Sequence, residues 1–184
     1  AIIQRGFASR DKGYAEVRAA IERAKPAGVF VITSSLDGTH GLRFQGLGRE
    51  PMSDPNDPQS YGPGSFWQRD FLSGHAPVET LLVPMDSRTT ASPDSAHAYA
   101  FYREGGWSWA IPYIAGLYAL ASQVRPDVSP DLFWKEALVT GDVIAIEAGG
   151  KKIRLERIVN PRRLIEALKG GAVLPPSGPR LPRR

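Results

Sequence analysis

The residue type best suited to chemistry in this sequence is the serine at position 108. A serine hydroxyl is a weak nucleophile and attacks a carbonyl only when a neighbouring base takes its proton. Ser108 lies two residues after the glycine pair 105–106 and precedes a stretch, Trp109 to Val124, whose apolar residues recur at helical spacing. At such a loop-to-helix junction, free backbone N–H groups and the helix dipole favour developing negative charge. The alternative interpretation is an ordinary helix N-cap. The chain has no cysteine, so no thiol competes as nucleophile.

The segment from Gly105 to Gly116 reads Gly-Gly-Trp-Ser-Trp-Ala-Ile-Pro-Tyr-Ile-Ala-Gly. It resembles the nucleophile signature of the subtilisin-like serine proteases (subtilases), in which Gly-x-Ser-x-Ala-x-Pro is followed by a residue pair and Ala-Gly. The resemblance covers about residues 1 to 169. It implies the C-terminal half of the catalytic domain of a serine endopeptidase, in which Ser108 attacks a peptide carbonyl and forms an acyl-enzyme. We expect Gly106 to permit close approach of substrate and backbone, and Pro112 to lie in the first helical turn, where its missing N–H costs nothing.

The same resemblance implies that the other two triad residues lie outside this chain. The family order is Asp, then His, then Ser, so the missing N-terminal half, in the same or another chain, is an expected partner and this chain alone is expected to be inactive. Asp37 to His40 is similar to the family's histidine motif, but Asp37 takes the place of the reactive histidine, and His40 is predicted to be a loop residue. Three acidic residues could approach the serine loop: Asp86, Asp94 and Glu104.

Residues 25–38 are similar to the subtilase segment that ends near the oxyanion-hole asparagine, whose place is taken by Leu36. Loss of such a side-chain donor costs about 10²–10³ in rate. The resemblance implies that Thr33, Ser34 and Ser35 line the pocket for the residue before the scissile bond. Ser34, Ser35 or Thr39 could supply a substitute donor, or the oxyanion hole is defective.

Two other functions therefore stay open beside the endopeptidase. One is a catalytically impaired pseudoprotease or peptide-binding module with the same fold. Leu36 favours this alternative, as do the two tryptophans beside the nucleophile, Trp107 and Trp109, which we expect to narrow access to it. The other is a non-peptidase esterase, which the Ala and Pro after the serine argue against, because esterases carry Gly-x-Ser-x-Gly.

The elements that must position the serine can be predicted from periodicity and turn residues. Helical spacing predicts helices over 11–25, 109–124, 129–139 and 162–169, with Ser129 and Asn160 as N-caps. Strands are predicted at 29–32, 42–44, 66–67, 79–85 and 98–102, with a hairpin over 143–155. Strand, helix and strand over the first thirty or so residues form a βαβ unit. The predicted fold class is α/β and subtilisin-like, a partial domain with a mainly parallel sheet flanked by helices.

Composition limits the partners of the chain. Of its 184 residues, 42% are hydrophobic and 23% charged, which is typical of a soluble globular protein. The folded domain is predicted to span residues 1–169. Much of the net charge of +4 lies toward the Pro- and Arg-rich end, so residues 170–184 are predicted to be a solvated, disordered tail, with no nucleic-acid partner. No apolar run is long enough for a membrane span. The expected ligand is a peptide or protein substrate.

The oxygen-rich segment Ser53 to Pro58 suits a calcium ion, but it lacks regular ligand spacing, so a solvated turn is preferred. No cofactor is predicted with certainty, and a structural calcium ion is the alternative. The family resemblance slightly favours a secreted or cell-surface location.

Overall fold

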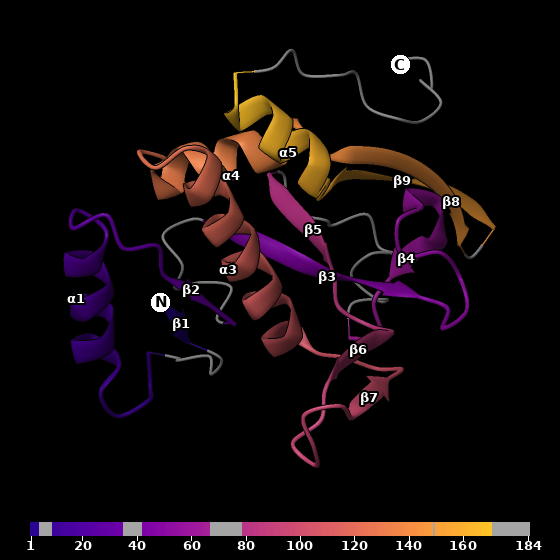
Figure 1. The fold of residues 1–184 in the computed structure, drawn as a ribbon, viewed down its shortest axis with the longest axis horizontal. Helices are drawn as coiled ribbons and strands as arrows, with labels where there is room; N and C mark the ends of the chain where they lie inside the picture. The colour runs from indigo at the N-terminus through magenta and orange to yellow at the C-terminus, as the bar shows by residue number, and fades with distance from the viewer. Residues whose placement is uncertain (4–8, 35–41, 67–78, 149, 171–184) are drawn as a thin grey trace.

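The computed structural model describes residues 1–3, 9–34, 42–66, 79–148 and 150–170 (Figure 1). Within these ranges the largest sheet has five strands in the order β4-β3-β5-β9-β8. Their bounds are Arg43–Arg49 (β3), Tyr61–Pro63 (β4), Thr80–Pro84 (β5), Asp142–Ala148 (β8) and Lys151–Ile158 (β9). The central pairings, β3 with β5 and β5 with β9, are parallel, and both edge pairings are antiparallel. The predicted α/β class is confirmed, with the parallel strands at the centre of the sheet.

A smaller parallel sheet is formed at the start of the chain. Strand β1 (Ile2–Ile3) pairs with β2 (Ile32–Thr33), and helix α1 (Tyr14–Ala24) lies between them in sequence. This arrangement confirms the predicted βαβ unit. The strand predicted over 29–32 begins only at Ile32, and Val29 is 41% exposed. The left-handed conformation of Gly13 (φ 84°) sets the start of α1 later than predicted.

The long helix α3 (Trp107–Val124) packs against strands of both sheets and against α4 (Pro130–Val139) and α5 (Pro161–Leu168) (Figure 1). Its buried residues recur every three or four positions, which confirms the predicted central helix. The predicted caps are also confirmed. The Ser129 hydroxyl accepts a hydrogen bond from the Leu132 N–H, and the Asn160 side chain accepts one from the Arg163 N–H.

The core lies on both faces of the main sheet because alternate side chains of a strand point to opposite sides. In β5, Leu81 and Val83 face the larger apolar cluster, which includes Ile111 and Ile114 of α3. Leu82 faces a smaller cluster on the opposite side. The sheet therefore holds α3, and with it the helix start that bears Ser108, at a fixed position.

Most of the short elements are not predicted by the sequence patterns. Strand β6 (Arg88–Ala91) pairs antiparallel with β7 (Tyr99–Tyr102), and the 3₁₀ turn η1 (Pro58–Ser60) precedes β4. Only β7 of these is predicted from sequence, because β6 is polar and β4 is three residues long. The strand predicted at 66–67 is not found at Phe66, which lies in a turn, and Trp67 is outside the described residues.

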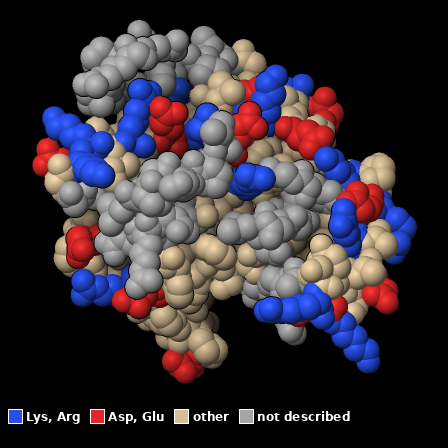
Figure 2. All heavy atoms as spheres, turned by 180° about the vertical axis from the view of Figure 1, so that it is seen from behind, with Lys and Arg blue, Asp and Glu red and all other residues tan. Residues whose placement is uncertain are grey.

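The surface of the described residues carries both signs of charge. Lys and Arg are interspersed with Asp and Glu around the rim of the face in Figure 2, so the net positive charge is not segregated on that face. None of the helices in the described ranges combines the length and apolar character needed to span a bilayer. Of the predicted tail at 170–184, all but Gly170 lies outside the described residues.

Candidate functional site

Ser108 lies in the first turn of α3, one residue after the helix begins at Trp107. The N-cap is Gly106, which has an extended backbone (φ −167°) and no capping side chain. The interpretation of Ser108 as an ordinary N-cap is therefore wrong, because the helix starts two residues earlier than its apolar periodicity predicts. The serine is half-buried and lies at the positive end of the helix dipole, where developing negative charge is stabilised.

The position of Pro112 differs from the prediction. It lies inside α3, five residues after Trp107, and not in the first turn. Proline has no N–H, so the Ser108 carbonyl cannot accept the i to i+4 hydrogen bond that residue 112 would otherwise donate to it. The helix therefore lacks one intrahelical hydrogen bond at the Ser108 carbonyl, while it continues through Pro112.

The loop before Ser108 packs closely against Met85, which is fully buried. A Cβ atom on Gly105 would lie 2.2 Å from the Met85 carbonyl oxygen, so only glycine fits there. Gly46 in β3 and Gly64 are similarly close to the Met85 side chain. Gly106, the glycine expected from the sequence to permit close approach, is less constrained, because a Cβ there would meet nothing closer than 3.8 Å. A glycine inside a strand, such as Gly46, is the local sequence signal that another segment of the same chain packs closely against the strand.

Asp86 fixes the same loop through hydrogen bonds. Its carboxylate accepts a hydrogen bond from the Gly105 N–H at 2.8 Å and from the Ser65 N–H at 3.0 Å, and the Ser65 hydroxyl donates to it at 3.3 Å. Asp86 is only 7% exposed. Of the three acidic residues expected near the serine loop, Asp86 is bonded to it, whereas Asp94 and Glu104 are exposed. We call Asp86, Ser65 and Gly105 the loop clamp.

Aromatic side chains surround the helix start. The Tyr102 and Trp109 rings pack with their centroids 4.7 Å apart, and Phe66, which is 70% exposed, lies close to Gly106. Trp107, by contrast, packs against the main apolar core. The two tryptophans therefore differ: one belongs to the core, and the other contributes with Tyr102 and Phe66 to an aromatic wall beside Gly106.

The residues expected to bind substrate are only partly described. Thr33 ends β2, which packs against α3, and it is just 3% exposed. Ser34 is half-buried, and its backbone N–H donates to the Ile3 carbonyl at 3.3 Å. Ser35 and Leu36 lie outside the described residues, as do Thr39 and His40. A substrate-binding role for Thr33, Ser34 and Ser35 stays a prediction.

The other candidate groups are exposed or take part in local turns. His97 is exposed before β7, and within the described ranges no side chain is hydrogen-bonded to the Ser108 hydroxyl. In the oxygen-rich segment, Asp54 accepts a hydrogen bond from the Asn56 N–H, and Asp57 caps η1 through the Gln59 N–H. These carboxylates take part in local turns. The described residues contain no group of three or more His, Cys, Asp or Glu side chains that could hold a metal ion.

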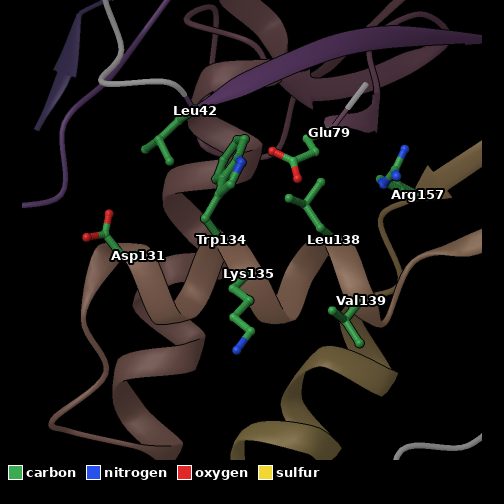
Figure 3. Close-up of a pocket in the computed structure, with 8 residues that line it drawn as sticks. All are labelled: Leu42, Glu79, Asp131, Trp134, Lys135, Leu138, Val139 and Arg157. Atoms are coloured by element: carbon green, nitrogen blue, oxygen red, sulfur yellow. The ribbon is translucent and has the colours of Figure 1, made fainter. Parts of the chain in front are cut away.

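A cavity of about 560 Å³ lies at the end of the main sheet where β3 and β5 begin (Figure 3). Leu42, before β3, and Glu79, before β5, line it together with Trp134 of α4, whose indole nitrogen faces Glu79 in Figure 3. The loop clamp follows the other end of β5, on the order of 20 Å away along the strand. This cavity is therefore separate from the serine site.

Solved structures of known proteins share the arrangement. The prenylagaramide maturation protease PagA aligns with a TM-score of 0.53 and 16% identity over 93% of this chain and 62% of that chain. The PatG macrocyclase domain gives a TM-score of 0.51 and 19% identity over 92% of this chain and 52% of that chain. The PatG macrocyclase in complex with peptide gives 0.51 and 18% identity, with the same coverage. No protein-family model and no curated protein matches the sequence.

The fold is that of the subtilisin-like proteases, and this part of the prediction is confirmed. At these identities the similarity establishes the fold alone. The chain spans about half to two thirds of the length of the structures it matches.

Proposed function

We propose that this chain carries the nucleophile-bearing part of a serine endopeptidase, with Ser108 as the nucleophile. In this proposal the chain is the C-terminal half of the catalytic domain. The observation that carries the proposal is the place of Ser108 in the first turn of a central buried helix, after a loop fixed by Asp86 and Gly105. A rigid support of this kind holds a nucleophile in the geometry that attack on a carbonyl requires.

The proposal assigns proton removal from Ser108 to a histidine and an aspartate in a segment preceding this chain. It rests on the resemblance of residues 105–116 to the subtilase nucleophile signature, because in that family the aspartate and the histidine precede the serine. The hydroxyl would attack a peptide carbonyl, the histidine would take its proton, and the leaving amine would depart with a proton from the same histidine. The chain by itself is then inactive.

A peptide is the substrate class that fits this site best. The wall formed by Phe66, Tyr102 and Trp109 offers aromatic surface beside Gly106, and such surface packs well on an extended chain with apolar side chains. One solved structure with the same fold, the PatG macrocyclase, is in complex with peptide. Thr33, Ser34 and Ser35 would contact the residue before the scissile bond.

The decisive experiment is labelling of the full-length protein with a fluorescent fluorophosphonate, which reacts with activated serines. We expect the wild type to be labelled and Ser108→Ala not to be. Ser122→Ala is the matched control, because Ser122 lies on the same helix and its hydroxyl donates to the Tyr118 carbonyl. Persistent labelling of Ser108→Ala would refute the assignment, and so would an upstream sequence without the histidine and aspartate.

A peptide-binding module without turnover is the second candidate. The aromatic wall favours it, because binding requires that surface but no activated serine. This candidate predicts that the fluorophosphonate does not label the full-length protein. It also predicts that the protein still binds peptides with aromatic or aliphatic side chains, and that Trp109→Ala weakens this binding. Hydrolysis of the same peptides by the wild type but not by Ser108→Ala would exclude it.

A further inference from the structure

A second cavity, of about 730 Å³, lies where β5 leads into β6, beside α3 and the first turn of α5. Arg49, at the end of β3, and Arg88, at the start of β6, line it together with Tyr61 and Tyr113. We call it the Arg49–Arg88 pocket. Ser108 is not among its described lining residues, and the volume falls in the range typical of small-molecule sites.

Arg88 is held in place by two contacts. Its guanidinium lies 5.1 Å from the centroid of the Tyr113 ring, and its Nη1 donates to the Pro84 carbonyl at 2.9 Å. A guanidinium has five N–H donors in a planar fork. The contact with Pro84 uses one of them, so the group is fixed in orientation while it keeps donors for a ligand.

Arg49 is also fixed by backbone contacts. Its Nη2 donates to the Ser87 carbonyl at 2.8 Å, and its Nη1 donates to the Glu50 carbonyl at 3.2 Å and to the Ser53 carbonyl. Carbonyl oxygens orient the guanidinium, but they carry no full negative charge. Within the described ranges neither Arg49 nor Arg88 forms an ion pair with a carboxylate.

The other charged groups at the pocket are already paired. Arg162, at the rim, lies 2.9 Å from the Glu166 carboxylate, and Asp142 lies 3.3 Å from the buried Arg163 guanidinium. The pocket therefore has two half-buried cations that form no ion pair among the described residues, although the Asp142 carboxylate also lines it and Asp54 lies near enough to act on Tyr61. Partly buried charges are costly unless an opposite charge compensates them.

The phenol of Tyr113 adds a neutral donor to this positive pocket. Burial raises the pKa of Tyr113 to about 12, so its hydroxyl keeps its proton at neutral pH. Burial also raises the pKa of Tyr61, whose hydroxyl donates to the Pro55 carbonyl at 2.8 Å. Proline rings of Pro55, Pro58 and Pro161 complete the lining with apolar surface.

We propose that the Arg49–Arg88 pocket binds an organic oxyanion. The phosphate or carboxylate head of the ligand accepts charge-assisted hydrogen bonds from the remaining donors of Arg88. Arg49, whose donors are directed to backbone carbonyls, adds positive charge to the same pocket. The apolar body of the ligand packs against the tyrosine and proline rings. Ser108 is not among the described residues that line this pocket, and the proposal does not depend on catalysis.

Calorimetric titration of the full-length protein with three compounds tests the proposal. Phenyl phosphate and benzoate represent the two head groups, and benzyl alcohol is a neutral compound of similar shape. We expect at least one anion to bind saturably and benzyl alcohol not to bind, and the tighter anion identifies the head group. Arg88→Gln should weaken the binding of that anion about tenfold or more. Arg23→Gln, an exposed charge change on α1, should leave its affinity unchanged.

A second variant keeps the test valid if Arg88→Gln fails to fold. Tyr113→Phe retains the ring beneath Arg88 and removes only the hydroxyl, and it should weaken anion binding about threefold. The proposal is overturned if neither anion binds the wild type saturably or if benzyl alcohol binds as tightly as the anions. It is also overturned if Arg23→Gln loses as much affinity as Arg88→Gln, or if the folded pocket variants keep full affinity.

Discussion

Removal of the Asp86 carboxylate should loosen the loop that precedes Ser108. In the folded chain this carboxylate accepts hydrogen bonds from the backbone N–H groups of Gly105 and Ser65. Asp86→Ala leaves both donors without their acceptor, whereas Asp86→Asn keeps the shape and one acceptor oxygen. The alanine variant should therefore be the more severe of the two.

The magnitude follows from the burial of the partners. A buried donor left without an acceptor costs about 1–3 kcal/mol. Ser65 is exposed and Gly105 is half-buried, so water partly replaces the lost acceptor. We expect Asp86→Ala to lower the free energy of unfolding by about 3 kcal/mol and Asp86→Asn by about 1–2 kcal/mol.

Urea-induced unfolding measures these changes by linear extrapolation. Glu104→Ala is the matched control, because Glu104 is an exposed acid next to Gly105 and its removal should change stability by less than about 0.5 kcal/mol. Amide hydrogen exchange gives a local readout, and the Gly105 N–H should exchange faster in Asp86→Ala. Equal losses of stability in the Asp86 and Glu104 variants, or an unchanged exchange rate at Gly105, would refute the role of the clamp.

Three further predictions concern helix α3 and the loop that leads into it. Gly105→Ala should destabilise the fold by about 3 kcal/mol, because the new Cβ would meet the Met85 carbonyl at 2.2 Å. Gly116→Ala, where no atom lies within 4 Å, should stabilise it by about 0.5–1 kcal/mol in the same urea assay. Burial raises the pKa of Tyr113 to about 12, so its contribution to stability is present below about pH 10 and is lost as the pH rises toward about 12. Tyr113→Phe should flatten this decline, and exposed Tyr99→Phe should not, as measured by unfolding at a series of alkaline pH values.

Each of these predictions has an outcome that contradicts it. A Gly105→Ala variant as stable as Gly116→Ala would mean that the serine loop does not pack against Met85 as described. If a phenolate forms near pH 10 in the folded wild type but not in Tyr113→Phe, it is that of Tyr113. Such a result would mean that the Tyr113 ring is accessible to water.

The sequence by itself determined the elements whose signals are local. The apolar periodicity of α3 and the caps at Ser129 and Asn160 depend on neighbours within one or two helical turns, so they could be predicted correctly. The pair of glycines before a long apolar helix located Ser108 at a loop-to-helix junction for the same reason. The start of that helix was misplaced, because glycine at the N-cap and tryptophan at the first position carry no strong start signal.

Only the tertiary structure decided how the serine loop is held. The Asp86 carboxylate and the Gly105 N–H meet across 19 positions of the sequence, and Arg49 reaches the Ser87 carbonyl across 38. Such contacts depend on which strands become neighbours and in what register, and no local pattern encodes that choice. The sequence therefore indicated which serine could act, while the packing of β3, β5 and α3 decided how its loop is fixed and that Arg49 and Arg88 line one pocket.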